Sequence, residues 1–128
     1  MSNDRNGRSS RPGRHQPMMS PRVRVNEILS IGPGKIKLLR EVQAQRSISG
    51  AARAMGMPYK RAWSLLNTLN QGLGQPVVET FAGGSGGGGA RLTPLGNALL
   101  ERYSALEERV REGTERELAA LLALCGPE

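Results

Sequence analysis

Residues 49–73 read SGAARAMGMPYKRAWSLLNTLNQGL, and this stretch decides the fold of the 128-residue chain. It predicts two helices joined by a tight turn. Ser49 is expected to cap the first helix, because a serine hydroxyl can accept a hydrogen bond from a free backbone N–H. Gly56 suits the left-handed residue that ends a helix, and Pro58 suits the opening of the next one.

The second of these helices has one apolar face at helical spacing, formed by Ala62, Leu65, Leu66, Leu69 and Leu73. Small Ala52, four residues before Gly56, lets the two helices approach closely. The stretch therefore predicts a helix-turn-helix, whose second helix can enter the major groove of DNA.

The opposite face of the second helix is polar and aromatic, with Tyr59, Lys60, Trp63, Ser64 and Asn67, and with Arg61 beside them. A solvated surface is the ordinary explanation of such a face. Two aromatic residues are uncommon on a merely solvated surface. The polar residues also fall in the first three turns, where a recognition helix meets base edges, so the pattern favours DNA binding.

Composition supports one small basic domain with tails. The net charge of +7 favours a polyanionic partner. Residues 22–92 carry ten Lys or Arg against three Glu, whereas residues 93–128 carry four Arg against seven Glu. This uneven charge suggests a DNA face and a separate face for another contact.

Residues 1–21 are rich in Arg, Gly, Ser and Pro, and they predict a disordered basic arm. Two interpretations of the arm stay open: contact with DNA phosphates or the minor groove, and a tail with no defined role. His15 is the only histidine and Cys125 the only cysteine, so we expect no catalytic constellation, metal or cofactor, and no intrachain disulfide. No apolar run reaches membrane-spanning length and no signal peptide is evident, which predicts a cytoplasmic protein.

The region before the helix-turn-helix predicts a short strand within residues 22–28 and a turn over residues 31–34. A helix is expected over residues 35–46. We expect its inward face to consist of Ile36, Leu38, Leu39 and Val42.

The region after it predicts a β-hairpin, with strands over residues 77–81 and 91–93 around the glycine-rich run 82–90. Such a run alone is most often a flexible linker. A hairpin that follows a helix-turn-helix makes a winged helix, and a glycine tip lets backbone N–H groups approach a phosphate.

Residues 93–125 predict a long C-terminal helix, with Thr93 as its cap and a possible kink near Gly113, where Thr114 and Glu117 form a capping-box pattern. Gly96 implies close backbone packing against the wing. The apolar stripe has no partner within a domain of this size, so we expect a dimer interface. Its residues are Leu99, Tyr103, Leu106, Val110, Leu118 and Leu121. The alternative is a helix folded back on its own domain.

Two segments resemble the DNA-binding domain of the molybdate-responsive regulator (ModE) family: SISGAARAMGM with YKRAW in residues 47–63, and GGSGGGGARLTPLG in residues 83–96. The resemblance covers roughly residues 22–124. A weaker similarity to the LysR-type helix-turn-helix covers residues 47–99. The resemblance implies a winged helix that dimerises through its last helix and regulates operons, often for molybdenum uptake or molybdoenzymes. It also implies that the first turns of the second helix and the wing over residues 83–91 contact DNA.

Two features depart from the family pattern. Pro58 stands where Ser is frequent. Full-length members also continue into oxyanion-binding domains, so we expect no molybdate site in these 128 residues.

The sequence thus predicts a mainly α fold with a small β-hairpin: an arm (1–21), a winged helix-turn-helix (22–92) and a dimerisation helix (93–125). The expected function is a non-enzymatic transcriptional regulator that binds an inverted-repeat operator in double-stranded DNA as a homodimer. The expected DNA-binding residues are Ser49, Tyr59, Lys60, Arg61, Trp63, Ser64, Asn67, Gly86, Gly87 and Arg91. Two alternatives stay open: a module that pairs with a full-length relative, and a non-specific nucleoid-type binder.

Overall fold

The computed structural model describes residues 19–82 and 88–126. A two-stranded hairpin comes first, with β1 (Val23–Arg24) antiparallel to β2 (Ser30–Ile31), and Val23 pairs with Ile31. The predicted strand over residues 22–28 is thus only two residues long. Asn26 explains this, because its side-chain oxygen accepts hydrogen bonds from the N–H groups of Ile28 and Leu29 and turns the chain.

Three helices form the centre of the domain: α2 (Pro33–Gln45), α3 (Ile48–Met55) and α4 (Tyr59–Leu73). The turn predicted over residues 31–34 is wrong, because Pro33 and Gly34 form the first turn of α2, as proline's fixed φ allows. The predicted inward face of α2 is confirmed, since all four of its residues are buried.

The turn between α3 and α4 has the predicted geometry. Gly56 ends α3 with φ 66°, and the backbone N–H of Met57 donates to the carbonyl of Ala52 at 3.0 Å. The predicted cap is wrong, however, because Ser47 and not Ser49 caps α3. The Ser47 hydroxyl accepts the N–H of Gly50 at 2.7 Å, since the helix begins one residue before Ser49.

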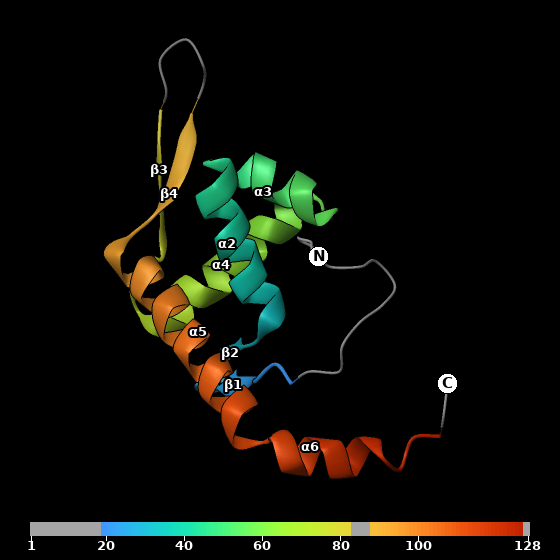
Figure 1. Cartoon of the computed structure of the whole chain (residues 1–128). Helices are drawn as coiled ribbons and strands as arrows, with labels where there is room; N and C mark the ends of the chain where they lie inside the picture. The colour runs from blue at the N-terminus through green and yellow to red at the C-terminus, as the bar shows by residue number, and fades with distance from the viewer. Residues whose placement is uncertain (1–18, 83–87, 127–128) are drawn as a thin grey trace.

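The wing is the antiparallel pair of β3 (Val78–Phe81) and β4 (Gly89–Leu92), in which Val78 pairs with Leu92 and Phe81 with Gly89. Figure 1 shows it projecting beyond the helices as a narrow arm. The hairpin was predicted, although β4 begins two residues earlier than expected. The expected contact residues Gly86 and Gly87 lie outside the described residues, as do residues 1–18 of the predicted arm.

Two helices complete the chain: α5 (Pro94–Gly113), capped by Thr93, and α6 (Glu115–Leu122). Figure 1 shows α5 running past the domain and α6 turning away from it. The chain changes direction at Thr114, but the predicted capping box does not form there. The Thr114 hydroxyl instead donates to the carbonyl of Val110, one turn back in α5.

The core lies between α2, α3, α4, the first half of α5 and the wing base, which we define by its buried residues Val77, Ala90 and Leu92. Its most deeply buried large side chains are Leu29, Ile36, Leu38, Leu39, Val42, Leu66, Leu69 and Val77. Gly96 allows α5 to approach the wing base, because a Cβ there would lie 2.3 Å from the carbonyl oxygen of Val77. The close packing predicted for Gly96 is therefore confirmed. None of the described helices is long and apolar enough to cross a membrane.

Candidate nucleic-acid interface

The polar face predicted for α4 is exposed along its length. Lys60, Ser64 and Asn67 lie in its middle, and Arg61 is exposed at one border. These positions share a surface because α4 is a regular helix whose apolar stripe is buried against α2 and α3. The structure therefore brings together the part of the expected DNA-binding set that lies on this helix.

Tyr59 and Trp63 form the other border of this face. The two residues are 50% and 38% exposed, and their rings meet edge to face with centroids 6.4 Å apart. The indole N–H of Trp63 donates to the hydroxyl oxygen of Tyr59. This pair leaves two aromatic surfaces in solvent beside cationic and hydrogen-bonding groups, which suits contact with sugars, thymine methyls or base edges.

The wing contributes a mixed surface. Arg91 Nε lies 2.9 Å from Glu79 Oε2 on the paired strand, and the Arg91 guanidinium also sits over the Phe81 ring, 5.3 Å from its centroid. Both partners of the ion pair are largely exposed, so the pair adds little stability. Glu79 offsets part of the Arg91 charge, so Arg91 is a weaker anion contact than its position in the sequence suggested.

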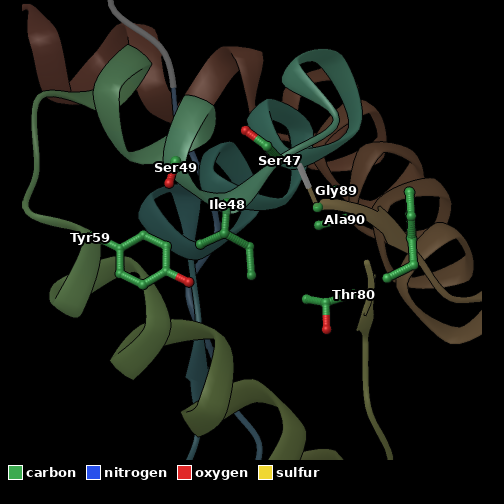
Figure 2. Close-up of a pocket in the computed structure, with 9 residues that line it drawn as sticks. Ser47, Ile48, Ser49, Tyr59, Thr80, Gly89 and Ala90 are labelled. Atoms are coloured by element: carbon green, nitrogen blue, oxygen red, sulfur yellow. The ribbon is translucent and has the colours of Figure 1, made fainter. Parts of the chain in front are cut away.

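A cleft separates the helix-turn-helix from the wing. It holds about 280 Å³, and its lining residues are Ser47, Ile48, Ser49, Tyr59, Thr80, Phe81, Gly88, Gly89 and Ala90. Figure 2 shows Ile48, Tyr59 and Thr80 reaching toward this space from α3, α4 and β3. Ser49 and Tyr59 were expected here. Ile48, Thr80 and Phe81 were not, because no local pattern indicates that β3 lies opposite the start of α3.

One backbone joint holds the wing beside the helices. The N–H of Ala90 in β4 donates to the carbonyl of Arg46 at 3.0 Å. Arg46 ends α2 in a left-handed conformation with φ 60°, which is rare for a residue with a side chain. Gly89 makes the joint possible, because a Cβ there would lie 2.9 Å from the Phe81 ring and 3.3 Å from the Arg46 oxygen.

The residues expected at a dimer interface differ in exposure. Tyr103 is only 4% exposed, and its hydroxyl donates to the carbonyl of Pro21. Its pKa is raised by burial and by the nearby carboxylate of Glu107. We therefore assign Tyr103 to the core of the domain rather than to a partner surface.

The other residues of that set remain accessible. Leu99 is partly buried against the core, and Val110 and Leu118 are half-buried. Leu106 is 38% exposed and Leu121 is 60% exposed. No residue of α6 is buried, so the apolar surface available to a partner begins near Leu106 and continues into α6.

Cys125 is exposed near the C-terminal end of the described chain. Within residues 19–82 and 88–126, no group of three or more His, Cys, Asp or Glu could hold a metal ion.

Comparison with known proteins gives relatives for part of the chain. No family model matches it. It is 43% identical over 77 residues to the molybdenum-pterin-binding protein MopA of Rhodobacter capsulatus, which is 60% of this chain and 29% of that protein. It is 37% identical over 86 residues to the DNA-binding transcriptional dual regulator ModE of Escherichia coli K12, which is 67% of this chain and 33% of that protein.

The chain thus spans about a third of the length of these relatives. Over the shared part, the resemblance to the ModE family predicted from residues 47–63 and 83–96 is confirmed.

Solved structures confirm the winged-helix fold. The crystal structure of a CbnR_DBD–DNA complex matches with a TM-score of 0.53 at 22% identity, over 69% of this chain and 95% of that one. The full-length LTTR LysG from Corynebacterium glutamicum, with bound effector Arg, matches with a TM-score of 0.51 at 19% identity, over 73% of this chain and 30% of that one. The predicted similarity to the LysR-type helix-turn-helix is therefore also confirmed as a similarity of fold.

Proposed function

We propose that this chain is a sequence-specific DNA-binding transcriptional regulator that inserts α4 into the major groove. The observation that carries the proposal is the exposed polar and aromatic face of α4, which lies across a cleft from the wing. A cationic and hydrogen-bonding helix face with an adjacent hairpin matches what groove binding requires. The relative named as a DNA-binding transcriptional dual regulator and the related fold solved as a DNA complex support it.

Lys60 is the residue that we expect to matter most on this face, because it lies at the centre of the exposed arc. The wild-type chain would first select a duplex of about 30 base pairs from a random pool, since the operator is unidentified. Lys60→Ala should then weaken binding to that duplex by about 5- to 150-fold, the loss of one bidentate base contact of about 1–3 kcal/mol. Fluorescence anisotropy at fixed salt gives the affinity.

The matched control is Arg109→Ala, which removes the same charge from the exposed surface of α5. Lys60→Ala and Arg109→Ala of equal affinity, with unchanged circular dichroism, would contradict the assignment of the α4 face. A wild-type chain that binds random and selected duplexes equally well would indicate the nucleoid-type alternative.

The functional unit is proposed to be a two-fold homodimer that reads an inverted repeat. One helix-turn-helix covers few base pairs, whereas two copies related by a dyad read half-sites about 34 Å apart. The apolar residues that the single chain leaves accessible at Leu106, Val110 and Leu121 offer a surface for the second copy. The net negative charge of residues 93–128 suits a position away from phosphates. A chain that is monomeric alone but pairs with a full-length relative would support the interaction-module alternative instead.

The proposed target genes are related to molybdenum, because the relatives include a molybdenum-pterin-binding protein and the regulator ModE. Genome-wide footprinting of bound sites tests this assignment directly.

A further inference from the structure

Three cationic side chains from separate parts of the chain line one cavity of about 270 Å³. Arg22 precedes β1, Lys35 lies in the first turn of α2 and Arg61 lies on α4. The remaining lining residues are Gly34, Met55, Met57 and Leu65. Over residues 19–82 and 88–126, the wall of the cavity therefore has three positive charges and no carboxylate.

Two of the three cations are held in place by the fold. Lys35 Nζ donates to the carbonyl of Ser30 at 3.0 Å. The Arg22 guanidinium packs over Gly32, where an added Cβ would lie 2.8 Å from Nη1. A side chain at position 32 would displace Arg22, so the absence of one lets the guanidinium reach the cavity.

The three charges repel one another. Partial burial lowers the pKa of Lys35, and the neighbouring Arg22 and Arg61 lower it further. Among the described residues, no carboxylate lies within ion-pair distance of any of the three. Like charges held together in this way are unfavourable for the chain alone and become favourable when an anion binds between them.

The position of the cavity beside α4 indicates which class of anion it would bind. Tyr59 faces the cleft beside the wing, whereas Arg61, two residues later and about 200° around the helix, faces the cavity. The exposed face of α4 thus has the wing on one side and the three cations on the other. A helix in the major groove, about 12 Å wide, has one sugar–phosphate backbone on each side.

We propose that Arg22, Lys35 and Arg61 form a phosphate site for the DNA strand on the side of the major groove away from the wing. The site rests on the proposed function, since it requires α4 in the groove. It binds a tetrahedral phosphate oxyanion by charge and N–H donors, so it positions the protein without reading sequence. Arg22 and Lys35 are thereby assigned a role that the sequence did not indicate.

The test is the salt dependence of DNA affinity in the double variant Arg22→Gln/Lys35→Gln. The slope of log affinity against log salt should fall in magnitude by about 0.9 for the lost phosphate contact. Affinity should also fall by the same factor for the selected duplex and for a scrambled one. Lys37→Gln is a single-charge control, because Lys37 is an exposed cation of α2 outside the cavity.

The outcomes distinguish failure of the phosphate site from failure of the proposed DNA-binding function. A double variant with the salt slope of Lys37→Gln, in a background where the wild type binds DNA, overturns the phosphate site alone. A wild type that does not bind DNA overturns the proposed function as well. Circular dichroism should show both variants folded, and Arg61→Gln alone provides a second variant if the double one does not fold.

A free anion is the other source of the same chemistry. Inorganic phosphate is compared with chloride at equal ionic strength in a thermal melt. A phosphate-specific rise in Tm that the double variant loses, with an unchanged DNA salt slope, would assign the cavity to a free oxyanion and overturn the DNA assignment.

Discussion

The helical centre of the domain and the C-terminal segment have similar apolar periodicity but opposite burial. On α4, Ala62, Leu66 and Leu69 are fully buried, whereas α6 has no buried residue and Leu121 is 60% exposed. A stripe of apolar residues predicts a helix in both places. The apolar periodicity does not indicate whether the surface that covers the stripe belongs to the same chain or to a partner. The stripe of α4 is covered by its own domain, whereas we propose that the stripe of α5 and α6 is covered by a partner.

The largest effect should come from placing charge on the uncovered stripe. Leu106→Asp with Val110→Asp should dissociate the proposed dimer, because burying two unpaired carboxylates costs several kcal/mol. Operator affinity should then fall toward the non-specific level, on the order of 10³-fold or more. Sedimentation reports the mass and footprinting the number of half-sites.

Ala105→Asp is the control, because it adds one carboxylate to an exposed neighbour of the stripe. Circular dichroism should show the winged domain intact in both variants. A wild-type chain that sediments as a monomer and protects a single half-site would contradict the proposed dimer.

A smaller effect, on the free energy of unfolding, should come from glycine-to-alanine substitutions at the two ends of α5, and the two should have opposite signs. Gly96→Ala should lower the free energy of unfolding by about 1–3 kcal/mol, because the new Cβ would meet the Val77 carbonyl and force the wing base to shift. Gly113→Ala should raise it by about 0.4–1 kcal/mol, because nothing lies within 4 Å of the added Cβ and alanine favours the helix. Urea denaturation measures both, and shifts of the same sign would refute the difference between the two ends.

The smallest effect concerns the cap of α3. Ser47→Ala should cost about 0.5–2 kcal/mol, because the Gly50 N–H loses its acceptor. Ser49→Ala should change stability by less than about 0.5 kcal/mol, since its side chain is exposed and does not cap the helix. Equal losses for the two serines in thermal melts would show that the cap is shared.

The helix-turn-helix could be predicted from the sequence, because its features depend on the types and spacing of residues that are close together in the chain. The left-handed Gly56 and the buried face of α4 depend on residue types and spacing that are local in the sequence. The close packing at Gly96 depends on the absence of a Cβ, which the residue type itself shows. The exposed arc of α4, and so most of the candidate contact residues, follows from the same periodicity.

Features that depend on tertiary packing could not be predicted in the same way. Ser47 and Ser49 stand two positions apart and either could cap a helix, so the cap depends on where the helix begins, which is at Ile48. Tyr103 fits a partner stripe as well as a core, and its contact with Pro21 decides for the core. The cavity of Arg22, Lys35 and Arg61 joins residues up to 39 positions apart, so no motif indicates it.

The joint between Arg46 and Ala90 gives the wing a fixed point of attachment to the helices. One backbone hydrogen bond, a glycine at position 89 and the ladder from Val78 to Phe81 set where the hairpin leaves the domain. An engineer who alters the wing should therefore keep residues 78–81 and 88–92 constant, because these residues hold the hairpin in place beside the helices.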